Sequence, residues 1–404
     1  MLRLTRLREY FRTSLWALPT AIVVVAVLLA LGLVELDRAG GWSASAFPLF
    51  GGTPVGARSA LTVVAGSTLS LTGVVFSITM IVLQLASSQY SPRVLTAFLA
   101  DYETKVALGV FLGTFSLSLT TLLAVHDGSG ADDAFVPRIA VTASFIAALV
   151  SVGVLIRFIH HVMHSVRVST IVRRLADETE RELTRLPTLC PNGCDDPSKG
   201  RPGEGGRLVL APRSGVVVDI DRAALVTWAA ERSLRVEVTR PVGAYVTKGL
   251  PLLGIFDDSG EAAEPDLGSL VSIADERDIR NDPVYGIMLL VDIALRALSP
   301  GVNDPRTAVL VLDQLERLLI VVSRTRLPAG AYVDAEGETR VWVREPDWET
   351  YVRTALEEVI DFGQESRMLR VRLLDLLADL DAVASAPSDV LEILAKRVRR
   401  AAER

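Results

Sequence analysis

The chain has 404 residues and a formal net charge of −6 at pH 7, and half of its residues are hydrophobic. This composition excludes collagen-like and disordered chains, two cysteines cannot form a disulfide framework, and the acidic balance leaves no global basic field for nucleic acid. A mean hydropathy of +0.37 beside 22% charged residues indicates very apolar segments joined to an ordinary polar domain.

Four apolar segments are each long enough to cross the hydrocarbon core of a bilayer, which takes about 20 helical residues. They are residues 16–34, 60–86, 106–125 and 138–159, and none has an ionisable side chain in its central part. Proton-coupled transporters, pumps and voltage sensors place such side chains inside the membrane. The segments therefore predict four membrane-spanning helices without those mechanisms.

The charges between the segments predict their orientation. Four arginines precede the first segment, and five arginines follow the fourth within residues 161–185. The loop between the third and fourth segments has three aspartates and no lysine or arginine. The positive-inside rule then places both termini and residues 161–404 in the cytoplasm.

Small and polar residues recur at helical spacing within the second and third segments. They can let helices pack closely, or they can line a water-filled path between subunits, and the sequence leaves both interpretations open. These candidate pore or helix-packing residues are Ser70, Ser77, Gln84, Ser91, Gly109, Gly113, Ser116 and Thr120.

Three of the four histidines lie where the fourth segment ends: His160, His161 and His164. They are candidates for juxtamembrane pH-sensitive groups, since histidine titrates near neutral pH. His160 and His164 do not predict a metal site, because no third ligand is evident near them. The charged pattern of residues 161–186 predicts a helical stalk, and the Pro- and Gly-rich residues 187–206 predict a linker.

Residues 207–262 alternate apolar and polar positions and predict a small β-rich module. The run PVGAYVTKGLPLLGIF looks like half of a biotinyl/lipoyl-type barrel-sandwich but lacks the lysine hairpin that carries a prosthetic group, so no cofactor is expected. Residues 263–404 predict a mostly helical domain with a hairpin at 331–343. A later helix has Tyr351, Val359 and Phe362 on one face.

Two Asn-Asp-Pro triplets each predict a helix start, with Asp282 and Asp304 as N-caps and proline at the first helical position. The functional alternative is that the turn between the two helices presents polar groups to an anion or another ligand. The candidate ligand or structural-turn residues are Asp292, Arg296, Ser299, Asn303 and Asp304.

Three runs, FSITMIVLQLASSQYSPRVL, FIHHVMHSVRVSTI and DIALRALSPGVNDPRTA, resemble domain-of-unknown-function family 2254, a family of predicted bacterial membrane proteins. The resemblance extends over most of the chain in the same order. It implies a multi-pass protein of the bacterial inner membrane with four N-terminal spans and a soluble C-terminal half. It implies no reaction, substrate or catalytic residue.

The expected fold is an α-helical membrane domain of four transmembrane helices (1–160) plus a cytosolic α+β domain with a barrel-sandwich-like β-module and a C-terminal helical part. The sequence has no phosphate-binding loop, nucleophile elbow or zinc-helix motif, so an enzyme is not expected. The first hypothesis is a homo-oligomeric channel or passive conduit regulated by the cytosolic domain. The alternative is a membrane-anchored sensory or scaffold protein. The expected partners are the lipid bilayer and further copies of the chain, without nucleic acid.

Overall fold

A computed structural model of the chain describes residues 16–39, 50–89, 102–126, 135–165, 167–186, 194–195, 201–203, 205–256, 270–383 and 389–401. The chain divides into two compact units, Met1–Arg167 and Val168–Arg404. We call them unit 1 and unit 2.

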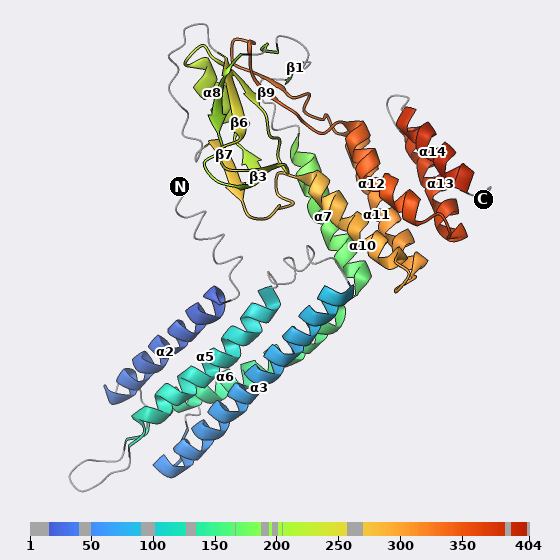
Figure 1. Cartoon of the computed structure of the whole chain (residues 1–404). Coiled ribbons are helices and arrows are strands. Elements are labelled where there is room, and N and C mark those ends of the chain that lie inside the picture. Colours follow the sequence, from blue (N-terminus) through green and yellow to red (C-terminus); the bar gives the residue numbers. More distant parts are fainter. Residues whose placement is uncertain are drawn as a thin grey trace. The chain divides into compact units, whose positions relative to one another are not determined.

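Unit 1 consists of helices, and the prediction of four apolar helices that could span a membrane is confirmed. Each is long enough and apolar enough to cross a bilayer, and the central one, α5, packs against the other three. The helices, shown in blue to green in Figure 1, are α2 (Ala17–Arg38), α3 (Pro54–Gln89), α5 (Tyr102–Ala124) and α6 (Arg138–Ser165).

Polar contacts at the helix ends show that α6 runs antiparallel to both α2 and α5. At one end, the Asp37 carboxylate at the end of α2 accepts a hydrogen bond from the backbone N–H of Ile139 in the first turn of α6, at 3.0 Å. At the other end, Arg157 near the end of α6 donates to Glu103 at the start of α5, at 2.8 Å. This up-and-down order is the one that four consecutive membrane spans require.

The described residues of unit 2 form nine short strands in two sheets. The larger sheet has the order β1-β8-β9-β4-β6-β2 and the smaller has the order β5-β3-β7. The strands are β1 (Cys194–Asp195), β2 (Arg207–Leu210), β3 (Gly215–Ile220), β4 (Arg235–Val238), β5 (Tyr245–Val246), β6 (Pro251–Phe256), β7 (Val271–Ala274), β8 (Ala331–Val333) and β9 (Thr339–Val343).

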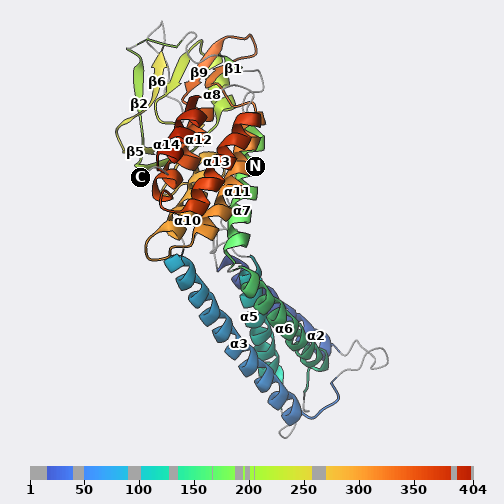
Figure 2. The same cartoon turned by 90° about the vertical axis from the view of Figure 1, so that its right-hand side faces the viewer.

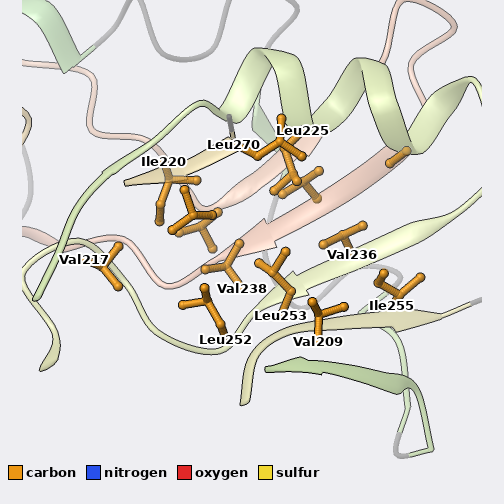
Figure 3. Close-up of a cluster of buried hydrophobic side chains, with 14 of the residues drawn as sticks. Val209, Val217, Ile220, Leu225, Val236, Val238, Leu252, Leu253, Ile255 and Leu270 are labelled. Carbon is orange, nitrogen blue, oxygen red and sulfur yellow. The ribbon is translucent and has the colours of Figure 1, made fainter. Parts of the chain in front are cut away.

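The two sheets and helix α8 (Arg222–Ala230) share one apolar core. Figure 3 shows Leu225 of α8 above Val236 and Val238 of β4, with Leu253 of β6 beside them. All four side chains are buried, and Val236 and Val238 point to the same side because they are alternate residues of β4. The core therefore joins strands that lie far apart in the sequence.

The predicted hairpin at residues 331–343 is the pair β8–β9, and it joins the larger sheet. Its strand β9 pairs in parallel with β4, with Val236 opposite Val341. Strand β1, within the stretch predicted as a linker, pairs with β8. The β-structure of unit 2 thus combines segments from three parts of the chain.

In the part of unit 2 that the structure describes, six further helices pack side by side (Figure 2). The segment predicted as a stalk divides between two elements, because α6 ends at Ser165 and α7 begins at Val168. The apolar stripe of α7 packs against α10 and α11. The helices are α7 (Val168–Arg185), α10 (Pro283–Leu298), α11 (Pro305–Arg324), α12 (Trp348–Phe362), α13 (Arg367–Val383) and α14 (Asp389–Ala401).

Candidate functional site

The small and polar residues of α3 form a stripe on the outer side of unit 1. Ser70, Ser77 and Gln84 are all exposed, as are Gly66 and Gly73 on the same side of the helix. At 100° per residue they fall within an arc of about 60°. We call these five residues the α3 stripe. Ser91 lies outside the described residues.

The opposite side of α3 is the one that packs in unit 1. Leu61, Thr68 and Val75 are buried there. These positions lie about 150–180° around the helix from the centre of the α3 stripe. The stripe therefore points directly away from α5, and apolar side chains such as Phe76 and Ile81, which are also exposed, flank it.

The glycines of the third predicted span have a packing role. A Cβ atom on Gly109 would lie 2.5 Å from Ile22 Cδ1, and one on Gly113 would lie 3.2 Å from Ile22 Cγ2. Both glycines are buried. They let α2 approach α5 closely, as small residues do between membrane helices.

The two polar residues that follow them on α5 also lie within the helix bundle. Ser116 and Thr120 are half-buried, and the Ser116 hydroxyl donates to the backbone carbonyl of Leu112 at 2.8 Å. A hydrogen bond that the sequence did not reveal joins α5 to α6, between the hydroxyls of Thr114 and Ser151 at 3.0 Å. The structure thus separates the two predicted stripes, since that of α5 faces neighbouring helices and that of α3 faces outward.

The histidines lie in the last turns of α6. His160 is exposed and His161 is half-buried, while the side chain of His164 lies outside the described part of the chain. Among the described residues, no three histidine, cysteine, aspartate or glutamate side chains are grouped so that they could hold a metal ion.

The Asn-Asp-Pro triplets build the same local structure twice, and both predicted N-caps are confirmed. Asn281 and Asn303 have left-handed backbones, with φ of 64° and 48°. Asp282 then caps α10 by accepting from the Tyr285 N–H at 3.1 Å. Asp304 caps α11 by accepting from the Thr307 N–H at 3.2 Å.

The Asp304 carboxylate is also bound by the Thr307 hydroxyl, at 2.7 Å. This hydrogen bond, opposed by partial burial, lowers the pKa of Asp304 below its ordinary value. The other candidates of this turn are placed apart: Ser299 is half-buried and donates to the Arg296 carbonyl at 2.7 Å, whereas Asn303 and Arg296 are exposed and Asp292 is half-buried on α10. The contacts of Asp304 and Ser299 are those of a helix cap and a tight turn.

Unit 2 contains a buried ionic group that sequence reasoning missed. Arg222 at the start of α8 donates from Nε to Glu345 Oε1 at 2.8 Å, and their side chains are only 5% and 8% exposed. The Tyr332 hydroxyl of β8 donates to the same carboxylate oxygen at 2.7 Å. Burial raises the pKa of Tyr332, and the negative charge of Glu345 raises it further, so the hydroxyl stays protonated.

A second ion pair lies where α10 begins. Arg277 contacts the Asp282 carboxylate through Nε at 3.0 Å and Nη2 at 2.7 Å, and its guanidinium lies 4.9 Å from the ring centre of Tyr285. Gly243, in the turn before β5, lies so close that a Cβ atom there would be 2.7 Å from Asp282 Oδ2. This contact brings the β-sheets of unit 2 against the start of α10.

Comparisons with known proteins agree with the resemblance found in the sequence. Residues 12–379 match the family described as "Predicted membrane protein (DUF2254)". The uncharacterized protein MT1328 of Mycobacterium tuberculosis is 33% identical over 383 residues, which are 92% of this chain and 72% of the relative. The uncharacterized protein Mb1321c of Mycobacterium bovis is 34% identical over the same shares. No solved structure gives a significant match.

Proposed function

The chain belongs to the DUF2254 family of predicted membrane proteins, and from this premise we propose that it is a multi-pass protein of the bacterial inner membrane. In this proposal α2, α3, α5 and α6 span the bilayer, and both termini and unit 2 lie in the cytoplasm. The distribution of arginines between the spans supports this orientation, because basic residues are retained on the cytoplasmic side.

We further propose that several copies assemble so that their α3 stripes line a passive, water-filled conduit. The observation that carries this proposal is that Ser70, Ser77 and Gln84 are exposed on the side of α3 that points away from α5. A serine hydroxyl can find a hydrogen-bond acceptor within its own helix, as Ser70 does by donating to the Gly66 carbonyl at 2.9 Å. A glutamine amide has two donors and an acceptor oxygen and is unfavourable against lipid tails, so it favours a polar or wet environment.

The proposal specifies a passive conduit because the spans have no ionisable side chain in their central parts. Mechanisms driven by protons or by membrane potential place such side chains in the membrane. The exposed glycines of the stripe, Gly66 and Gly73, would let neighbouring copies approach closely.

For the β-sheets of unit 2 we propose a structural, barrel-sandwich-like module that supports regulation of the conduit. In favour of this role, one apolar core joins both sheets to α8. The sequence offers no lysine hairpin of the kind that carries a prosthetic group.

The test is solute and ion flux through liposomes that contain the purified full-length chain. We expect flux in the wild type, and we expect Ser77→Leu and Gln84→Leu to reduce it by adding apolar bulk to the stripe. The matched control is Ser67→Leu, an exposed serine about 60° around the same helix from Ser70, which should leave flux unchanged.

Liposomes that stay tight to several ions and small solutes would contradict the conduit. They would favour the competing function, a membrane-anchored sensory or scaffold protein. Equal loss of flux in Ser67→Leu and Ser77→Leu would contradict the assignment to the stripe.

A further inference from the structure

The described residues of α3, α5 and α6 form two separate apolar clusters where these three helices pack together (Figure 2). The buried members of the first cluster include Leu61 of α3, Val125 directly after α5, and Val141 of α6. The second cluster takes one residue from each of the same helices: Val75, Phe111 and the half-buried Leu155. All three helices thus take part in both clusters.

A middle layer follows from the spacing of these residues. On each helix the residues that join the two clusters are 14 positions apart, as Leu61 and Val75 are on α3. Seven residues make nearly two helical turns and advance a helix by about 10 Å. The residues halfway between the clusters therefore lie at one level and on the same side of each helix as the clusters. They are Thr68, Ser118 and Ala148, and we call them the central layer.

The central layer is polar, and its side chains are small. Thr68 and Ser118 are 3% and 0% exposed, and Ala148 is half-buried. Leucine, valine and phenylalanine occupy the corresponding positions in the two clusters. The side chains of the central layer therefore occupy less volume than those of the clusters on either side.

The buried hydroxyl of Ser118 has no hydrogen-bond partner among the described residues. The hydroxyl of Thr68, by contrast, donates to the Val64 carbonyl at 2.8 Å. The hydroxyl of Thr121, one turn after Ser118, donates to the Leu117 carbonyl at 2.8 Å. The oxygens of Thr68 and Thr121 keep lone pairs that can accept a further hydrogen bond. An unpaired hydroxyl in a buried site is unfavourable, so this arrangement calls for a ligand that can bond to all three groups.

More hydroxyls lie about one turn away, between α5 and α6. Ser151 donates to a carbonyl of its own helix at 2.9 Å, so Thr114 is the donor in the 3.0 Å hydrogen bond between their two hydroxyls. The buried Ser144 likewise donates to a carbonyl of α6 at 2.9 Å. Because α5 and α6 are antiparallel, Ser144 lies level with Thr121. The surroundings of Ser118 therefore offer several free acceptor oxygens, whose own protons are already used.

We propose that the central layer binds a water molecule, which accepts a hydrogen bond from the Ser118 hydroxyl and donates to the oxygens of Thr68 and Thr121. Water fits because it combines two donors with an acceptor, which complements one free hydroxyl among several free acceptors. The apolar clusters on both sides separate this water from the ends of the bundle, so it is a bound water inside one copy of the chain. The inference rests on the packing of unit 1 and not on the conduit, so tight liposomes would leave it standing.

The direct test measures magnetisation transfer from water protons to the serine side chains, by solid-state NMR of the full-length chain in lipid bilayers. The chain contains ¹³C-labelled serine, and the signals of Ser118 and Ser116 are assigned by their loss in Ser118→Ala and Ser116→Ala. Ser116 is the reference because its hydroxyl donates within its own helix and lies outside the central layer. We expect faster transfer to Ser118 than to Ser116, and equal or slower transfer to Ser118 would overturn the proposal.

Thr68→Val tests the second partner of the water, because valine keeps the shape of threonine but has no hydroxyl. This variant should remove most of the transfer to Ser118. The matched control is Thr79→Val on the same helix, where the half-buried Thr79 hydroxyl donates to the Val75 carbonyl at 2.8 Å outside the central layer. Transfer to Ser118 that is unchanged in Thr68→Val, or reduced equally in both variants, would contradict the assignment.

The melting temperature in detergent gives an independent test with an opposite sign for the two cases. If Ser118 binds water, Ser118→Ala removes a hydrogen bond and should lower the melting temperature by about 2–4 °C. If the hydroxyl is dry and unpaired, its removal relieves an unfavourable burial and raises the melting temperature. Ser116→Ala should leave it unchanged. A melting temperature of Ser118→Ala that equals or exceeds that of the wild type would overturn the proposal.

Discussion

Arg222 Nε donates to Glu345 Oε1 at 2.8 Å although 123 residues separate them in the sequence. The contact joins the start of α8 to the segment between β9 and α12. Both side chains are buried, and the Arg222 guanidinium also lies 5.9 Å from the ring centre of Tyr332. This ion pair therefore links the predicted β-module to the segment that follows the β8–β9 hairpin, which belongs to the C-terminal part of the chain.

The buried pair predicts a large asymmetry between single and double substitutions. Glu345→Leu leaves the Arg222 guanidinium buried without its counter-charge and should lower the free energy of unfolding of unit 2 by about 3–5 kcal/mol. Arg222→Met combined with Glu345→Leu removes both charges and should recover most of that loss. Thermal unfolding of the full chain in detergent, followed by limited proteolysis of unit 2, measures both.

Tyr332→Phe provides the matched control for this pair, because it removes only the hydroxyl that donates to Glu345. It should cost about 1.5–3 kcal/mol, the range for a hydrogen bond to a charged group. If Glu345→Leu is as stable as the wild type, the ion pair does not hold the two segments together.

Gly109 predicts a packing defect in unit 1. In Gly109→Leu, the new Cβ atom would lie 2.5 Å from Ile22 Cδ1 and 3.3 Å from Pro19 Cα. Overpacking of this kind costs about 1–3 kcal/mol. The thermal stability of the monomeric fraction in detergent should fall accordingly.

Gly73→Leu is the control for Gly109→Leu, since a Cβ atom on Gly73 has no heavy atom within 4 Å. It should leave the monomer as stable as the wild type. An equal loss in both variants would show that α3 has the same packed surroundings as α5.

Asp304 predicts a pH-dependent contribution to stability. The Thr307 hydrogen bond lowers its pKa in the folded chain. The contribution is therefore fully present above the unfolded pKa of about 3.9 and is lost as the pH falls through the lower folded value. Asp304→Ala should cost about 1 kcal/mol near neutral pH, and its difference from the wild type should shrink as the solution is acidified below about pH 4.

Asp304→Asn separates capping from titration, because asparagine is also a good N-cap but has no charge to lose. The measurement is the melting temperature from neutral to acid pH. Near neutral pH, this variant should show little loss of stability relative to the wild type. A difference between Asp304→Ala and the wild type that does not change with pH would contradict the role of the carboxylate.

The α3 stripe predicts contact between copies of the chain. With Cys190 and Cys194 replaced by serine, Ser77→Cys should form disulfide-linked dimers on mild oxidation in membranes. Leu149→Cys should not, although the Leu149 side chain on α6 is 73% exposed. The reverse result, with linkage at 149 and none at 77, would place the subunit interface on the other side of unit 1.

Features that depend on local sequence could be predicted. The four apolar runs gave helices because each must be long and uncharged to cross a bilayer. The N-caps Asp282 and Asp304 could be recognised because a cap bonds only to the next few residues.

Features that depend on distant partners could not be predicted. The hairpin at 331–343 was expected, but its pairing with β4 joins Val236 to Val341 and has no local signal. The Arg222–Glu345 pair is hidden for the same reason. The two stripes looked equivalent in the sequence, and only the position of α5 among its neighbours separates the packed Gly109 from the exposed Ser77.

The central claim is that the chain crosses the bilayer four times and leaves unit 2 in the cytoplasm. The direct measurement is labelling by a membrane-impermeant maleimide in spheroplasts that express the full chain without Cys190 and Cys194. A cysteine at His126, exposed beyond the end of α5, should react in intact spheroplasts, and a cysteine at Glu336 should react only after permeabilisation. Reaction at 336 in intact spheroplasts, with protection at 126, would contradict the claim.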